Sequence, residues 1–370
     1  MTSFAAYLYP WDVDGDPAAA DRIAGLGITE VSLAAAYHDV RAVAPFHPAH
    51  RIVTRAAAVY YQPDPDRWRG TRMRPAVCGE SPPGSFERAA RRLRAAGLRV
   101  SAWLVIAHNE TLAVAHPDAT VRNAFGDPYP WALCVASPDV REYAATLAAE
   151  VASADDVDGI ELEACGWYGF DHLSGHDKIG QALAGPLLDI CFCPSCESAG
   201  TAAGLNVAVL RDEVRAAIDA HAPLPAQAGD PVHRVRADLA AGFLRAVVTS
   251  ARAAAPGKPV LVHTHPDPRQ AGSNPGFSPS RLGDVDGVIL GCPAAVSSAA
   301  ALVSEGARVY GGRPLRIAAT LPAVTALGGR PDELPALAGA VFASGATEVR
   351  FYHVGLASAV DLAAISKATY

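Results

Sequence analysis

The chain has 370 residues, half of them hydrophobic, and a formal net charge of -7. This length accommodates two average domains or one large barrel, and the charge, with no Lys/Arg-rich stretch, argues against nucleic-acid binding. No apolar run reaches membrane-spanning length, and no basic segment with an A-x-A site marks a signal peptide. The seven cysteines are an odd number, and three of them are clustered. We therefore expect a cytoplasmic protein with no disulfide framework and no membrane partner.

Short β-rich segments alternate with helical patterns along the whole chain. The predicted strands cover residues 4–9, 30–36, 99–107, 157–163, 259–265, 285–291, 315–321 and 348–353. The predicted helices include residues 17–25, 85–97, 139–152, 234–255, 294–305 and 332–344. This alternation predicts parallel βαβ units, and eight strands favour closure into one α/β domain, a (β/α)8 TIM barrel over residues 1–370. An open doubly wound sheet is the alternative, but no G-x-G-x-x-G turn follows the first strand.

Two long segments interrupt the alternation. Residues 39–82 predict a hairpin-like insertion that pairs residues 51–62 with 71–77. Residues 165–231 predict a zinc-binding loop and a helix near 207–220. Each segment follows a strand, which places both on the catalytic face of a barrel.

Three cysteines in six residues form the motif C-x-C-x-x-C, at Cys191, Cys193 and Cys196. This spacing lets three thiolates converge on one tetrahedral ion, whereas buried apolar thiols seldom occur in such a cluster. A structural zinc site needs a fourth ligand. The candidates are Cys134 and Cys165, with His172 and His176 as weaker options.

Two carboxylates end the fourth predicted strand. Because successive strand residues point to opposite faces, Glu161, Glu163 and Cys165 share one face. Carboxylates that face a barrel interior are costly unless they are paired or used, and proximity raises one pKa, which suits a general acid. We predict a catalytic role for Glu163. Glu161 is either catalytic or a structural ion-pair partner.

Histidines end several predicted strands. His263 and His265 alternate on the fifth strand, where such a pair binds a metal ion or a ligand, and we predict ligand contact for His265. His108 follows the third strand and His353 ends the eighth, so both are expected at the same mouth. Each is interpreted as substrate-binding, with a loop hydrogen bond as the alternative.

Aromatic and polar residues close the first two strands and follow the fourth. Trp11, Trp167 and Tyr168 have faces that suit the C–H faces of a sugar ring, although ordinary packing explains them equally well. Asp12 and His38 lie at the ends of the first two strands. We predict substrate contacts for Trp11, Asp12, His38 and Tyr168.

Cys134 opens the stretch Cys-Val-Ala-Ser-Pro-Asp-Val-Arg, which leads into a helix and then into the strand of Glu163. Together with the cysteine run, residues 131–196 resemble the barrel of family 42 glycoside hydrolases, the zinc-containing β-galactosidases. In that family a Cys-x-x-Ser-Pro-x-x-Arg segment precedes the fourth strand and a C-x-C-x-x-C run follows it. The resemblance implies that Glu163 is the acid/base glutamate. It also implies one structural Zn2+ bound by Cys134, Cys191, Cys193 and Cys196.

Three features depart from the family pattern. Leu162, not asparagine, precedes Glu163, and the distance along the chain from Glu163 to Cys191 is longer. The seventh strand ends at Thr320-Leu-Pro and carries no glutamate where the family has its nucleophile. Since most glycoside hydrolases use two carboxylates, the second must come from elsewhere. The candidates are Asp12, Glu161, Asp171 and Asp267.

We therefore predict a carbohydrate-active enzyme, a glycoside hydrolase that acts on a small-molecule carbohydrate or glycoside. Its predicted catalytic residues are Glu163, Glu161 and Asp267. One alternative is a metal-dependent sugar isomerase, epimerase or lyase, with Glu163, His263 and His265 around a divalent ion. Another is a non-catalytic carbohydrate-binding barrel.

Overall fold

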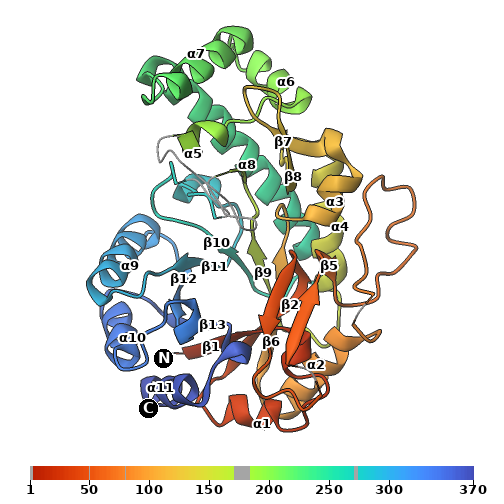
Figure 1. The fold of residues 1–370 in the computed structure, drawn as a ribbon, viewed down its shortest axis with the longest axis vertical. Coiled ribbons are helices and arrows are strands. Elements are labelled where there is room, and N and C mark those ends of the chain that lie inside the picture. Colours follow the sequence, from red (N-terminus) through yellow and green to blue (C-terminus); the bar gives the residue numbers. More distant parts are fainter. Residues whose placement is uncertain (1–2, 50, 80, 171–183, 271–273) are drawn as a thin grey trace.

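Eight parallel strands close into a barrel. The structure is a computed structural model that describes residues 3–49, 51–79, 81–170, 184–270 and 274–370 (Figure 1). The barrel strands are β1 (Ser3–Leu8), β2 (Glu30–Tyr37), β6 (Arg99–Val105), β9 (Gly159–Glu163), β10 (Val260–His263), β11 (Gly287–Gly291), β12 (Arg316–Pro322) and β13 (Glu348–Tyr352). β1 pairs in parallel with both β2 and β13, which closes the sheet on itself. The predicted (β/α)8 barrel is confirmed, and the open doubly wound sheet is wrong.

Helices surround the strands. They are α1 (Ala19–Ala24), α2 (Ser85–Ala95), α4 (Pro138–Ala152), α8 (Ala226–Ala254), α9 (Val296–Tyr310), α10 (Leu334–Ala343) and α11 (Ala359–Thr369). α2 shows why they form, because Phe86, Ala89, Ala90 and Leu93 recur at helical spacing and are all buried. Between β10 and β11, the described residues contain no α-helix but only the 3-10 turn Pro279–Arg281. Prolines recur there and remove the amide donors that a helix needs.

A helical extension projects from one end of the barrel. It consists of α5 (Ala184–Leu188), α6 (Pro194–Ala202), α7 (Val207–Asp219) and the first part of α8, seen at the top of Figure 1. These helices share a small hydrophobic core of their own, which includes Leu187, Phe192, Leu210, Val214 and Val232. The extension falls mostly within the predicted insertion 165–231, whose limits stay a prediction.

The segment 39–82 contains a hairpin, but its strands are not those expected. β3 (Val40–Val43) pairs antiparallel with β4 (Ile52–Arg55), whereas the predicted pairing of 51–62 with 71–77 is wrong. A single isolated bridge joins Val59 to Val77, and β5 (Ala58–Val59) pairs with the end of β2. One physical reason is that Pro75, inside the second predicted strand, lacks the amide donor that a ladder needs, while β3 and β4 contain no proline.

Charged side chains fill part of the barrel interior. Arg350 of β13 is fully buried and forms ion pairs with Glu30, Glu161 and Glu348. The hydroxyl of Ser32 donates to the Glu161 carboxylate at 2.6 Å. Another part of the interior is apolar and consists of Leu261, Ile289 and Ala318. A buried charge is costly unless it is paired, so these groups are stable only as a set.

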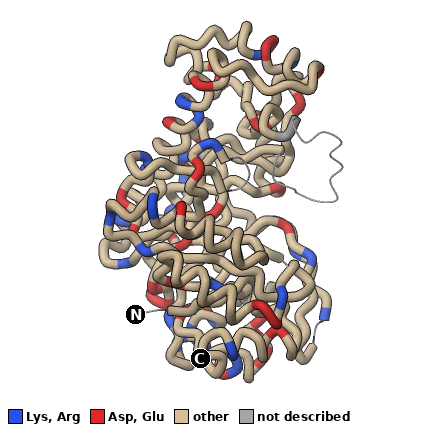
Figure 2. Tube along the Cα trace, turned by 90° about the vertical axis from the view of Figure 1, so that its left-hand side faces the viewer, with Lys and Arg blue, Asp and Glu red and all other residues tan. Residues whose placement is uncertain are grey.

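Charges elsewhere are interspersed along the chain. Figure 2 shows acidic and basic residues mixed over the barrel helices and the extension, and many form pairs such as Arg88 with Asp14 at 2.8 Å. None of the helices in the described residues is long and apolar enough to span a membrane.

Candidate active site and zinc site

Glu163 is the last residue of β9, at the carboxyl end of the barrel strands. Its side chain is 15% exposed and lies 4.0 Å from Nε2 of His263. The indole Nε1 of Trp103 donates to the same carboxylate oxygen at 2.7 Å. Catalytic residues of (β/α)8 barrels come from this end of the strands. Glu163 is thus a half-buried, oriented carboxylate on the catalytic face.

Glu161 lies deeper on the same face, as the strand alternation predicts. Its carboxylate is 2.6 Å from Nε2 of His263. Burial alone would raise the pKa of Glu161, but the charge of Arg350 and the hydrogen bonds of His263 and Ser32 lower it to about 2. Burial alone would lower the pKa of His263, but the charges of Glu163 and Glu161 raise it. Glu161 is therefore ionised and paired with Arg350, and the raised pKa of the neighbouring His263 favours its protonated form.

Aromatic rings surround Glu163. The Trp103 ring centroid lies 4.8 Å from that of Tyr7 and 4.7 Å from that of Tyr37. The ring of Tyr352 lies 6.4 Å from that of Trp103, and burial, followed by the charge of Glu163, raises the pKa of its phenol. Tyr37, Trp103 and Tyr352 come from three different strands. They form an apolar wall around one charged group.

Two of the predicted histidines meet beside this wall. The rings of His38 and His108 stack, with centroids 4.3 Å apart and planes at 15°. His108 also lies 4.8 Å from the ring of Tyr168. Burial lowers the pKa of His38, so its imidazole is neutral at pH 7. The structure thus brings together His38, His108 and Tyr168.

His353 contacts the wall from the end of β13. Its Nε2 lies 3.5 Å from the hydroxyl of Tyr37, and its ring stacks on Tyr9 at 5.0 Å. Burial and the neighbouring His38 lower its pKa to about 3. Trp11 also stacks on Tyr9, with ring centroids 4.4 Å apart, and is buried. Its position is that of ordinary packing behind the mouth.

Three other predicted site residues have local partners. Asp12 is buried and accepts the main-chain N–H of Tyr9 at 2.8 Å, and burial raises its pKa to about 7. It lies against Gly355, where a Cβ would collide with its carboxylate. Asp267 is exposed and accepts the main-chain N–H of Arg269, while its own N–H donates to His265 Nδ1 at 3.0 Å. Of the expected partners of Glu163, neither Asp12 nor Asp267 contacts it among the described interactions.

Some predicted residues lie outside the described residues. Asp171, His172 and His176 fall in residues 171–183. His265 is described, but β10 ends at His263, so strand alternation does not place the two histidines on one face. Cys165 also lies beyond its strand, since β9 ends at Glu163 and Ala164 has a φ of 50°.

The sequence reasoning missed Trp103, Arg350 and the three tyrosines at positions 7, 37 and 352. A signal was present in β13, where Glu348, Arg350 and Tyr352 alternate and so share the inward face. Trp103 likewise alternates with Ser101, another inward residue, which donates to Glu30. An arginine at the centre of a predicted interior strand requires acidic partners, and that requirement identifies the network.

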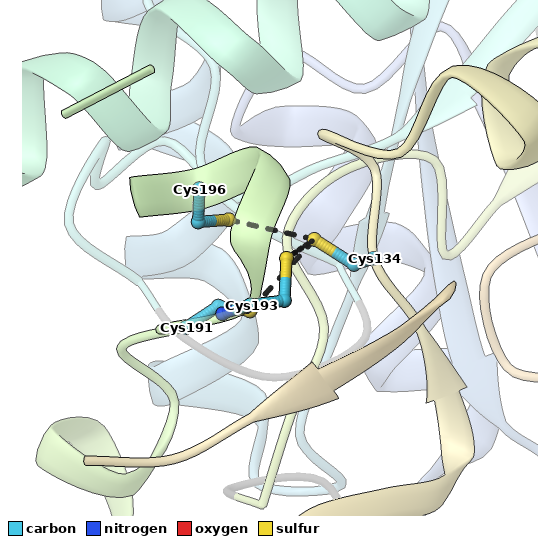
Figure 3. A group of neighbouring side chains, drawn as sticks. All are labelled: Cys134, Cys191, Cys193 and Cys196. Atoms are coloured by element: carbon cyan, nitrogen blue, oxygen red, sulfur yellow. Dashed lines mark hydrogen bonds between the residues drawn. The ribbon is translucent and has the colours of Figure 1, made fainter. Parts of the chain in front are cut away.

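Four cysteine side chains converge at the base of the extension (Figure 3). The Sγ atom of Cys134 lies 3.5 Å from Cys196, 3.5 Å from Cys193 and 3.8 Å from Cys191. A tetrahedral site with Zn–S distances of about 2.3 Å has S···S edges of about 3.8 Å, so the arrangement fits a zinc ion. Of the two cysteines considered as fourth ligand, the group contains Cys134 and not Cys165.

Main-chain amides support the same assignment. The N–H groups of Arg122 and Cys193 both donate to the Cys191 sulfur, each at 3.4 Å. Such contacts orient and stabilise metal-binding thiolates. Cys134 follows β8 (Pro128–Leu133), whereas Cys196 lies in α6. A bound ion would therefore join the helical extension to the segment after β8.

Replacing Cys193 by Ser should abolish this zinc site. We expect the zinc bound by this group to fall from one ion per chain to near zero, and Tm to fall by about 5–10 °C, because a bound ion would join two segments. Metal analysis and thermal unfolding measure both. The matched control is Cys292→Ala, a buried cysteine outside the group, which should retain its zinc. Loss of activity with zinc content and Tm unchanged would contradict a structural role.

No family model and no curated protein matches this sequence. Solved structures do match. The glycoside hydrolase domain of PgaB (BpsB) from Bordetella bronchiseptica has a TM-score of 0.66 at 16% identity, over 100% of this chain and 99% of that domain. α-L-Fucosidase isoenzyme 2 from Paenibacillus thiaminolyticus has a TM-score of 0.63 at 16% identity, over 100% and 49%. Gan42B, a GH42 β-galactosidase from G. stearothermophilus, has a TM-score of 0.60 at 11% identity, over 99% and 56%.

This chain thus spans about half the length of the fucosidase and the β-galactosidase. At these identities the likeness shows a shared fold. The fold therefore defines this protein as a (β/α)8 barrel. The three matched structures share this fold.

Proposed function

We propose that this protein hydrolyses a glycosidic bond, with Glu163 as the general acid that protonates the leaving oxygen. The observation that carries the proposal is a half-buried carboxylate, held by Trp103 on the catalytic face and surrounded by aromatic rings. The likeness to barrels named as glycoside hydrolases supports the same class.

Glu161 and Arg350 lie deeper in the barrel than Glu163, and we assign them positioning roles. Glu161 is bound by Arg350, Ser32 and His263, so its lone pairs are engaged and it is poorly suited to attack a substrate. It instead holds His263 below Glu163. A protonated His263 would offset the negative charge that Glu163 carries once it has given up its proton.

The sugar would lie against the aromatic wall. The ring of Tyr352 is the partly exposed one of the three, and its face suits the C–H face of a pyranose. Tyr37 and Trp103 are buried and would support it from within. Of the predicted substrate-binding residues, His38, His108, Tyr168 and His353 gather at the same mouth, and we propose that they contact sugar hydroxyls. Trp11 would lie behind the mouth and support Tyr9 by packing against its ring.

The zinc ion would have a structural role. Four cysteine ligands fill a tetrahedral site and leave no position for a substrate. A reducing compartment keeps free thiols available for zinc, so we propose a cytoplasmic location.

The proposal is tested with a panel of 4-nitrophenyl glycosides. We expect release of 4-nitrophenol from at least one sugar. The anomeric configuration of the product, followed by NMR, then shows whether a second carboxylate attacks, with retention, or activated water attacks, with inversion. Saturable sugar binding with no turnover across the panel would contradict the proposal and favour the non-catalytic carbohydrate-binding barrel.

A further inference from the structure

Glycoside hydrolysis uses two carboxylates in most families, and Glu163 has no assigned partner. Glu161 is buried in an ion pair, and neither Asp12 nor Asp267 contacts the proposed acid among the described interactions. The sequence reasoning missed another carboxylate at the same mouth. This residue is Asp39, which lies two positions beyond the end of β2.

The carboxylate of Asp39 lies beside the two stacked histidines of the mouth. One of its oxygens is within 4.8 Å of a ring nitrogen of His38 and of a ring nitrogen of His108. The main-chain carbonyl of Asp39 accepts a hydrogen bond from Nδ1 of His38 at 2.6 Å, since a carbonyl oxygen can only accept. Backbone and side chain of Asp39 are thus both tied to the mouth.

A row of contacts connects this position to Glu163. The ring of His38 lies 4.1 Å from that of Tyr37, which lies 4.7 Å from that of Trp103. Nε1 of Trp103 in turn donates to the Glu163 carboxylate at 2.7 Å. Burial lowers the pKa of His38, and the charges of Glu163 and Asp39 both raise it, which agrees with a shared mouth.

The register of three neighbouring strands sets the separation of the two carboxylates. Ala36 of β2 is level with Leu104 of β6, and Leu104 is level with Leu162 of β9. Tyr37 and Glu163 are the next residues, so β2 and β9 end at one level with β6 between them. Since neighbouring strands are about 4.8 Å apart, these two strand ends are about 10 Å apart.

That spacing suits one of the two hydrolytic mechanisms. Carboxyl groups lie about 5–5.5 Å apart in retaining enzymes and about 6.5–9.5 Å apart in inverting enzymes, which place a water between sugar and base. Asp39 is half-buried, and among the described residues no group donates to its carboxylate. Its oxygens are therefore available to a water molecule, whereas those of Glu161 are engaged by Arg350.

We propose that Asp39 is the general base of an inverting hydrolysis, with Glu163 as the acid. The inference rests on the proposed function and adds its second catalytic residue. Asp39 takes a proton from water while the water oxygen forms a bond to the anomeric carbon. The bond from that carbon to the leaving oxygen breaks, and the leaving oxygen takes the proton of Glu163. The released sugar has the opposite anomeric configuration.

The wild-type product gives the first test. A 4-nitrophenyl glycoside that the enzyme hydrolyses is followed by NMR from the start of the reaction, before the sugar mutarotates. We expect the first-formed sugar to be inverted. A retained configuration would overturn the role of Asp39 as a base. Absence of turnover by the wild type across the panel would instead overturn the proposed hydrolysis, and this inference with it.

Replacing Asp39 by Asn gives the second test. We expect kcat to fall by about 10²–10⁴-fold, with far-UV circular dichroism and Tm unchanged. The loss should be similar for 4-nitrophenyl and alkyl glycosides, because the base acts on water and not on the leaving group. In Asp39→Ala, added azide should restore turnover and give a glycosyl azide of inverted configuration, since azide attacks without a base.

The matched control is Glu110→Gln. Glu110 begins α3 (Glu110–Ala115), two residues after His108, and is exposed. Its replacement removes one negative charge from the same rim and should leave kcat unchanged. Asp39→Asn with the kcat of the wild type, or Glu110→Gln with a loss as large as that of Asp39→Asn, would overturn the assignment of Asp39.

Discussion

Replacing Glu163 by Gln should lower kcat for a 4-nitrophenyl glycoside by about 10²–10⁴-fold, the range expected for loss of a general acid–base group. Glutamine has nearly the same shape and can still accept the Trp103 hydrogen bond, so the fold should be kept. It cannot donate a proton to the leaving oxygen. Steady-state kinetics measure the effect, and far-UV circular dichroism and Tm establish that the variant is folded.

Comparing two leaving groups makes this test more specific for a general acid. A 4-nitrophenolate leaves readily without protonation, so the loss of kcat should be larger for an alkyl glycoside, which needs the acid more. Glu142→Gln serves as the control, because Glu142 is an exposed glutamate on α4 and should be fully active. Activity of the Glu163→Gln variant equal to wild type on both substrates would remove Glu163 from the mechanism.

Replacing Arg350 by Met should destabilise the fold by about 3–5 kcal/mol, the cost of breaking a buried ion pair. Glu30, Glu161 and Glu348 would lose their shared buried cation. Urea denaturation followed by tryptophan fluorescence measures the free energy of unfolding. As a control, Arg308→Met breaks an exposed pair with Glu305 and should leave the urea midpoint unchanged.

The same network predicts a pH dependence. The folded-state pKa of Glu161 is about 2, below the ordinary 4.5. Its contribution is therefore complete above pH 4.5 and is lost as the pH falls toward 2, by about 3 kcal/mol in total. Glu161→Gln should flatten this part of the stability profile. Equal profiles for wild type and Glu161→Gln between pH 5 and 2 would contradict the ion pair.

The local sequence pattern predicted much of the fold and part of the site. The predicted bounds of all eight barrel strands lie within a few residues of the observed ones. Each strand is a short hydrophobic run bounded by turns and helical patterns. The hairpin of β3 and β4 was misplaced, since strands of four residues give too little pattern. The C-x-C-x-x-C spacing and the position of Glu163 at a strand end also follow from neighbouring residues alone.

The sequence by itself therefore determined the barrel, the cysteine run and the carboxylate at the end of the fourth barrel strand. The tertiary structure brings Cys134, and not Cys165, to the other three cysteines, as the family resemblance implied. Only the tertiary structure decided that Glu161 pairs with Arg350. It also decided that His38 stacks on His108. The physical reason is that these partners lie 57 to 189 positions apart in the sequence, and they meet only when the barrel closes and the extension packs against it.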